Sequence, residues 1–264
     1  MRIIRFEDGS GQVRLGEWLA DGRARAVRGG LFDGLQTTDE VLAVGRLLAP
    51  LEPVNIIAIG LNYRKHAEEG GSPIPSEPLI FSKLTSSVIA SGEPIILPES
   101  APTEVDWEAE LAVVIGRTAR QVSESDALSY VLGYTCANDV SARDCQRHRD
   151  KQWTRAKSFD TFCPLGPAIL VDSSVNPNAL RIRGRLNGQI MQDSSTADMI
   201  FSVPFLISYL SRQFTLRPGT VILTGTPEGV GFGRKPPQYF KPGDTYSVEI
   251  EGIGELTNPV VAAG

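Results

Sequence analysis

The sequence has few cysteines and few histidines. Its 264 residues include three cysteines and two histidines. An odd number of cysteines with no Cys-x-x-Cys spacing argues against a disulfide framework and against a zinc knuckle. We therefore interpret Cys136, Cys145 and Cys163 as small buried hydrophobic residues.

Long apolar runs and clustered positive charge are also missing. The longest apolar runs, such as Pro204 to Ile207, are far too short to span a bilayer. The first residues, Met1 to Asp8, lack the apolar segment of a signal peptide, so a cytoplasmic location is the default expectation. The net charge of -5 and the pI near 5.2 do not support a nucleic-acid or membrane-surface partner, because both need clustered positive charge.

The composition is that of an ordinary globular protein, with 41% hydrophobic and 22% charged residues. A chain of this length can bury one large core and carry a small additional domain. We expect residues 1–50 to form a small N-terminal domain rich in β-strands, in which short β-like runs alternate with turns such as Asp8-Gly9. Thr38 to Leu48 is predicted to form a short helix. Ala49 to Pro53 ends that helix, and we place a domain boundary there.

Residues 51–264 are expected to form the second, larger domain. Val54 to Gly60 is a compact apolar segment that predicts a strand. Asn187-Gly188 is the strongest hairpin signal in the chain, and a second hairpin is expected around Gly252 to Gly254. Ser202 is expected to cap a helix that runs to about residue 212.

Two glutamates at the start of an apolar strand are candidate metal ligands. Leu111 to Ile115 is a β-branched apolar run, and residues two apart in a strand point the same way, so Glu108 and Glu110 should project together. Two buried like charges repel each other unless a positive charge lies between them. A third carboxylate comes from Asp139, and three hard oxygen ligands favour Mg²⁺ or Mn²⁺ over zinc. The alternative is that the glutamates lie on the solvated face of an edge strand.

His66 and Glu69 are a candidate catalytic pair. They are three residues apart, so on a helical turn they share a face. A carboxylate beside an imidazole raises its basicity and fixes its tautomer, which makes the pair a candidate general base for water. The segment that follows, Gly70 to Pro78, is rich in glycine and proline and is typical of a lid. The alternative is a surface helix that carries a charge pair.

A polar tract from Ser141 to Lys157 contains candidate hydrogen-bond donors. A pocket with three carboxylates and an anionic substrate needs donors, so we select Arg143, Gln146 and Lys157 from it. The rest of the tract is interpreted as a solvated loop with mixed charges, and His148 as a surface residue.

A glycine-rich turn follows a predicted strand near the end of the chain. Its glycines are followed by Pro236 and Pro237, which cannot open a helix, so the dinucleotide-binding fingerprint is absent. Glycines let the backbone approach a ligand closely, and Thr226 offers a hydroxyl and an amide to a carboxylate.

Together these segments resemble the fumarylacetoacetate hydrolase family over about residues 54–262. The resemblance implies a mixed, mostly β roll of the α+β class, a bound Mg²⁺ or Mn²⁺, and a homodimer. The ordered motifs that carry it are Gly60-Leu61-Asn62-Tyr63 with His66 and Glu69, Glu108-x-Glu110, Asn138-Asp139-Val140-Ser141, Lys157-Ser158-Phe159-Asp160-Thr161-Phe162, and Thr224-Gly225-Thr226-Pro227.

The resemblance also implies a role for each candidate residue. It assigns the metal to Glu108, Glu110 and Asp139, catalysis to His66, Glu69 and Lys157, and substrate contacts to Arg143, Gln146 and Thr226. Four positions depart from the family pattern and put the substrate in doubt: Leu84, Cys145, Cys163 and Glu228.

These roles lead to a hypothesis about the reaction. The protein is expected to be a hydrolase that cleaves a C–C bond of an acylpyruvate-like acid through a pyruvate enolate, with His66 activating the water and Lys157 stabilising the enolate. Decarboxylation of an oxaloacetate-type 2-oxo acid and isomerisation of an unsaturated 2-hydroxy acid are alternatives on the same scaffold. The non-enzymatic alternative is a protein that binds a metal and a ligand but catalyses no reaction.

Overall fold

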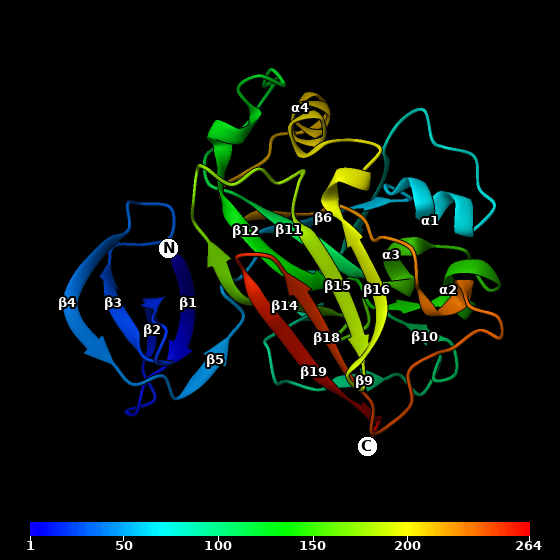
Figure 1. Cartoon of the computed structure of the whole chain (residues 1–264), viewed down its shortest axis with the longest axis horizontal. Helices are drawn as coiled ribbons and strands as arrows, with labels where there is room; N and C mark the ends of the chain where they lie inside the picture. The colour runs from blue at the N-terminus through cyan, green and yellow to red at the C-terminus, as the bar shows by residue number, and fades with distance from the viewer.

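β-Strands make up most of the regular structure in the computed structural model, which describes residues 1–264 (Figure 1). The largest sheet has twelve strands. Its main path runs through β4 (Gln36–Leu42), β3 (Ala24–Arg28), β2 (Val13–Trp18), β1 (Arg2–Glu7), β14 (Cys163–Leu170), β12 (Val131–Asn138), β11 (Ala109–Ile115), β17 (Thr220–Leu223), β6 (Asn55–Gly60) and β7 (Leu79–Lys83), while β5 (Arg46–Leu48) pairs with β1 and β8 (Val88–Ile89) with β14.

A second sheet of five strands covers the middle of the first. Its order is β16 (Gln189–Ser195), β15 (Arg181–Leu186), β18 (Thr245–Ile250), β19 (Gly254–Ala262) and β9 (Ile95–Leu97). Strands β15, β18 and β19 pack against β11, β12 and β14, and Figure 1 shows them in front of the larger sheet. A cluster of 42 buried hydrophobic residues forms the main core, which includes Trp107 packed against Phe240 and Tyr246.

The helices are short, and three of them lie together on one side of the sheets. These are α1 (Arg64–Glu69), α2 (Arg143–Arg147) and α3 (Trp153–Ala156), on the right of Figure 1 near the two-stranded sheet of β10 (Val105–Asp106) and β13 (Ser141–Ala142). The fourth is α4 (Val203–Gln213), and the 3₁₀ turns are η1 (Thr85–Ser87), η2 (Ala127–Tyr130), η3 (Thr196–Asp198) and η4 (Gly231–Gly233).

The predicted fold class is confirmed, because the chain is a mostly β, α+β structure with a small N-terminal group of strands. The hairpin at Asn187-Gly188 is confirmed, and both residues have the positive φ that its turn needs. The helix after Ser202 is also confirmed, with the Ser202 side chain accepting a hydrogen bond from the Phe205 amide.

The predicted helix from Thr38 to Leu48 is wrong. That segment forms β4 and β5 instead, with Val41 opposite Arg25 and Thr37 opposite Val27 in the pairing of β4 with β3. The Thr38 hydroxyl, expected to cap a helix, donates to the carbonyl oxygen of Ala26 on β3. Pairing with a neighbouring strand therefore outweighs the local helix signal.

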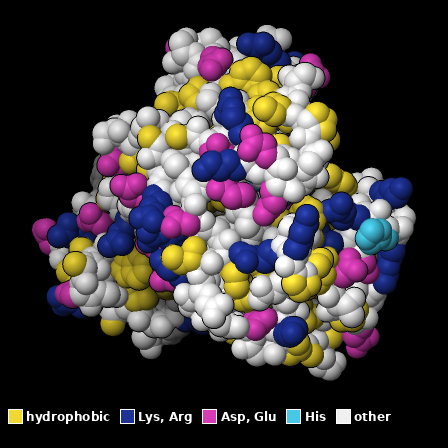
Figure 2. All heavy atoms as spheres, turned by 45° about the vertical axis from the view of Figure 1, so that its right-hand side comes forward, with side chains coloured by type: hydrophobic (Ala, Val, Ile, Leu, Met, Phe, Trp, Pro, Cys, Tyr) yellow, Lys and Arg dark blue, Asp and Glu magenta, His cyan; other side chains and the backbone are white.

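The first five strands form the lobe on the left of Figure 1 and are joined to the main sheet by the pairing of β1 with β14. The domain boundary near residue 50 stays a prediction. None of the helices has the length and hydrophobicity needed to cross a membrane. Basic and acidic side chains are interspersed over the face in Figure 2, as the mixed composition leads one to expect.

Candidate metal centre and active site

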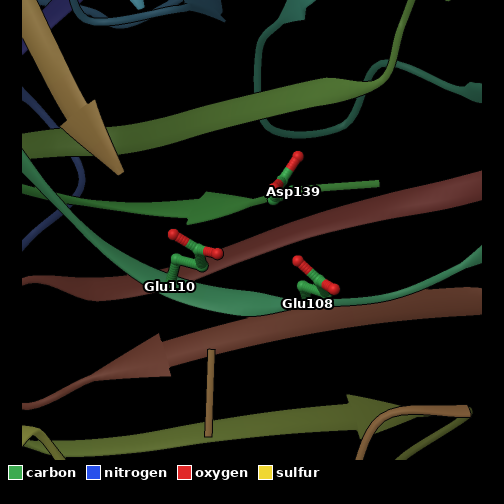
Figure 3. A group of neighbouring side chains, drawn as sticks. All are labelled: Glu108, Glu110 and Asp139. Atoms are coloured by element: carbon green, nitrogen blue, oxygen red, sulfur yellow. The ribbon is translucent and has the colours of Figure 1, made fainter. Parts of the chain in front are cut away.

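Three buried carboxylates meet where β11 and β12 pair. Glu108 and Glu110 lie at the start of β11, and Asp139 directly follows β12 (Figure 3). The antiparallel register sets Ala109 opposite Asn138, so the Asp139 amide donates to the Glu108 carbonyl oxygen at 2.9 Å. One carboxylate oxygen from each residue lies within 4.8 Å of the others. Only 6% of Glu108 and 2% of Glu110 is exposed, so the edge-strand interpretation does not hold.

Two buried lysines neutralise part of this negative charge. The Lys157 ammonium donates to Glu108 Oε2 at 2.7 Å and to Asp139 Oδ2 at 2.5 Å. The Lys83 ammonium donates to the other oxygen of Asp139, Oδ1, at 2.6 Å and also to the backbone carbonyl of Lys157. The Lys157 ammonium is thus held between two of the three carboxylates, and Lys83 fixes the Asp139 side chain and the Lys157 backbone.

The pKa values show where charge remains uncompensated. Burial opposes ionisation of Glu108, but Lys157 and Arg143 outweigh it and lower the pKa of Glu108 to about 2. Burial raises the pKa of Glu110 well above its ordinary value, and the nearby carboxylates of Asp139 and Glu108 raise it further. Of the three carboxylates, Glu110 is therefore the one that forms no ion pair with a lysine or arginine of the protein. Three hard oxygen ligands, one of them without a cationic partner, fit Mg²⁺ or Mn²⁺.

The glycine-rich turn after β17 holds Glu110 in place. The Gly225 amide donates to Glu110 Oε2 at 2.8 Å. Gly225 has a φ of 98°, and a Cβ there would lie 2.8 Å from the Asn62 Cβ, so this position needs glycine. The Asn62 side chain in turn donates to the carbonyl oxygens of Thr224 and Phe201.

His66 and Glu69 contact each other on α1, as their spacing predicts. The distance from His66 Nδ1 to Glu69 Oε2 is 3.3 Å, and 8% of the His66 side chain is exposed. The Glu69 carboxylate also accepts from the Gly229 amide at 3.1 Å and 3.2 Å, which attaches α1 to the glycine-rich turn. With Nδ1 facing Glu69, Nε2 is the ring nitrogen left for exchange with a ligand. The segment after α1, residues 70–78, contains no helix or strand.

Arg143 and Thr226 are more occupied by protein partners than the sequence predicts. The Arg143 guanidinium lies 2.8 Å from Asp106 Oδ2 and 2.7 Å from Glu108 Oε1, and it donates to Gln146 Oε1 at 2.8 Å. The Thr226 hydroxyl donates to the Ala109 carbonyl oxygen and accepts from a glutamine amide. The Thr226 hydroxyl thus has two protein partners, whereas the Thr226 amide has none within the protein.

One cavity of about 290 Å³ brings the candidates together. All nine predicted site residues except Glu69 and Asp139 line it. Those two do not line it but contact His66 and Lys157 respectively. The roles assigned to the nine residues stay proposals.

Four residues near the cavity were not selected from the sequence. Lys83 ends the apolar strand β7, where a lysine normally faces solvent, so nothing local indicates its buried position. Asp106 precedes Glu108 by two residues, so it continues the two-residue spacing of Glu108 and Glu110. That spacing is a signal that could have identified it. It accepts from the amides of Gly231 and Phe232 and pairs with Arg143. The others are Arg147 and Phe232, which line the cavity.

The four departures from the family pattern lie outside this cavity. Glu228 lies 3.7 Å from the Lys65 ammonium and accepts from the Ser194 hydroxyl, while Leu84 is 55% exposed. Cys145 and Cys163 are buried.

Comparisons with known proteins agree on the family. Residues 55–261 match the family described as "Fumarylacetoacetate (FAA) hydrolase C-terminal", and residues 1–50 match "Rv2993c-like, N-terminal". Among named relatives, the chain is 50% identical over 218 residues to the oxaloacetate tautomerase fahd2 of Xenopus laevis, covering 81% of this chain and 68% of that protein. It is 48% identical over 217 residues to the human oxaloacetate tautomerase FAHD2A, covering 81% of this chain and 69% of the relative.

Solved structures cover the whole chain. A 5-carboxymethyl-2-hydroxymuconate delta-isomerase from Mycobacterium smegmatis is similar with a TM-score of 0.89 and 41% identity, over 100% of both chains. A 2-hydroxyhepta-2,4-diene-1,7-dioate isomerase from Mycobacterium marinum is similar with a TM-score of 0.87 and 40% identity, over 100% of this chain and 99% of the other.

Proposed function

The chain belongs to the fumarylacetoacetate hydrolase family, and on that premise we propose that it interconverts the keto and enol forms of a small 2-oxo acid. This reaction belongs to the isomerase alternative rather than to the C–C hydrolysis first expected from the sequence. The named relatives at about half identity are tautomerases, and the similar solved structures bear the names of isomerases. The chain is accordingly a family enzyme, with its substrate and reaction proposed.

The observation that carries the proposal is the set of groups gathered at one cavity. They are a candidate cation site formed by Glu108, Glu110 and Asp139, the Lys157 ammonium, and the single acid–base pair of His66 and Glu69. Keto–enol exchange requires a proton to leave one atom and return to another, and these groups suffice for it. The volume of about 290 Å³ is just below the roughly 300–1,000 Å³ typical of ligand sites, which suits a compact acid.

Each residue has a defined part in this reaction. A divalent ion bound by the three carboxylates would polarise the 2-oxo group of the substrate. His66, oriented through Nδ1 by Glu69, exchanges the proton at C3 through Nε2. The Lys157 ammonium lies beside the carboxylates and stabilises the negative charge that develops on the 2-oxo oxygen. Gln146, whose Oε1 is taken by Arg143, offers its amide N–H groups to the substrate carboxylate.

The proposal is tested by following the ultraviolet absorbance of enol-oxaloacetate with Mg²⁺ and with a chelator. We expect rapid conversion of enol to keto that the chelator abolishes. His66→Ala should lower the rate by roughly 10²–10⁴-fold, the usual contribution of a general base. His148→Ala is the matched control, because His148 is the other histidine and is exposed away from the cavity. Full activity of His66→Ala would remove His66 from the mechanism.

Hydrolysis of an acylpyruvate is the second candidate. A histidine oriented by a carboxylate can also activate water, which is the observation that favours it. Incubation with acetylpyruvate separates the two, because hydrolysis releases acetate and pyruvate whereas tautomerisation releases neither. Carbon dioxide release from oxaloacetate would instead identify a decarboxylase.

The homodimer implied by the family resemblance also stays a proposal. Sedimentation of the purified chain tests it, since a dimer has twice the 28.6 kDa of one chain.

A further inference from the structure

Two of the three lysine and arginine side chains that line the cavity form ion pairs with acidic side chains. Lys157 contacts Glu108 and Asp139, and Arg143 contacts Glu108 and Asp106. These contacts join side chains that are at most 8% exposed, so both of these cations already have acidic partners within the protein.

Arg147 is the exception. It lines the same cavity, yet its guanidinium makes no ion pair and no side-chain hydrogen bond within the protein. It is exposed, whereas Arg143 is 2% exposed. The two arginines are four residues apart on α2, which displaces Arg147 by about 6 Å along the helix axis. The pair therefore extends from the buried end of the cavity to its mouth.

Phe232 holds the Arg147 guanidinium at this mouth. The centre of the guanidinium of Arg147 lies 4.6 Å from the Phe232 ring centroid, and that of Arg143 lies 4.4 Å from the same ring. The His66 ring meets Phe232 edge-on, with 6.1 Å between centroids. Stacking on a ring restricts the guanidinium without using any of its five N–H donors. Arg147 thus contacts the same ring as the candidate proton-transfer residue His66, with its donors free.

We propose that Arg147 is a specificity-determining residue that binds the second carboxylate of a dicarboxylic 2-oxo acid. The first carboxylate and the 2-oxo group lie at the buried end, and the distal carboxylate pairs with the planar fork of Arg147. A substrate with a neutral tail leaves this arginine without a partner. The inference rests on the proposed function only in taking the ligand to be a 2-oxo acid.

Two acids of equal chain length test the inference by calorimetry in the presence of Mg²⁺. 2-Oxoglutarate and 2-oxovalerate differ only in a terminal carboxylate against a methyl group. Arg147→Met should weaken binding of 2-oxoglutarate by roughly fivefold to tenfold, between the effects of an exposed and a buried ion pair, and leave 2-oxovalerate unchanged. Arg147→Lys should retain part of the preference, because it keeps the charge but loses the fork.

Arg149→Met is the matched control. It removes the same charge from the same segment, but Arg149 pairs with Asp144 and does not line the cavity. It should leave the affinities for both acids unchanged. With oxaloacetate as substrate, Arg147→Met should raise KM and leave kcat nearly unchanged, as expected for a contact made equally in the ground and transition states.

The outcomes separate this inference from the proposed function. If Arg147→Met lowers the affinity for both acids equally, or lowers neither affinity, the proposed role of Arg147 is overturned while the proposed reaction is unaffected. If the protein does not convert enol-oxaloacetate but its affinity for 2-oxoglutarate still depends on Arg147, the proposed reaction is wrong and the binding role of Arg147 stands. Failure of wild type to bind either acid would overturn both.

Discussion

Replacing Lys157 by methionine removes the one cation that bridges two of the candidate metal ligands. Its ammonium donates to Glu108 Oε2 at 2.7 Å and to Asp139 Oδ2 at 2.5 Å, and 2% of the side chain is exposed. Burial favours the neutral amine, but Asp139 and Glu108 outweigh it and raise the pKa of Lys157. The bridge is therefore charged at neutral pH, and methionine fills a similar volume without the charge.

The expected loss of stability can be worked out, because the substitution leaves two buried carboxylates without their shared cation. Breaking a buried ion pair from one side costs about 3–5 kcal/mol. For a chain of this size that lowers Tm by about 6–20 °C, at roughly 2–4 °C for each kcal/mol. Lys83 and Arg143 still contact Asp139 and Glu108 in the variant, so we expect the lower part of this range.

Added Mg²⁺ should then stabilise Lys157→Met more than it stabilises wild type. In wild type the ion must compete with an ammonium for the same carboxylates, and in the variant this competitor is gone. A ligand at 100 times its Kd adds about 2.7 kcal/mol, so most of the loss is recovered.

Thermal unfolding of both proteins with and without Mg²⁺ measures these shifts. Lys241→Met is the control, because Lys241 is exposed and its ammonium has no acidic partner in the structure. The reasoning fails if metal-free Lys157→Met is as stable as wild type, or if Mg²⁺ raises its Tm no more than that of wild type.

Three further predictions concern residues around the site. Lys83→Met should weaken Mg²⁺ binding in calorimetry by about 10–100-fold, because Asp139 loses the donor that orients it; unchanged affinity would contradict this. Gly225→Ala should cost about 1–3 kcal/mol in denaturant unfolding, since its φ of 98° disfavours a side chain and its Cβ would meet Asn62; wild-type stability would contradict it. Burial raises the pKa of Cys163 to about 12, so thiol reagents near neutral pH should label it only after unfolding, and rapid labelling of the folded protein would argue against a buried thiol.

Local signals in the sequence account for much of the fold and part of the site. The two-residue period of a strand sets Glu108 and Glu110 on one side, and the three-residue spacing brings His66 to Glu69. The turn at Asn187-Gly188 also depends only on neighbouring residues. Each of these features is decided within a few residues, so the pattern suffices.

Features that depend on distant segments could not be derived in this way. The meeting of Asp139 with the two glutamates depends on the register of β11 and β12, so the sequence could name Asp139 as a candidate third ligand but could not show that it reaches them. Lys83 is buried only because its strand ends beside residues 139–157. Residues 38–48 carry a helix signal, but pairing with β3 and β1 decides their conformation.

The cation site is tested most directly by a crystal structure of the protein soaked in Mn²⁺, using the anomalous scattering of the metal. The account predicts one strong anomalous peak bounded by the carboxylates of Glu108, Glu110 and Asp139. A map with Mn²⁺ bound elsewhere and none between these three side chains would contradict it.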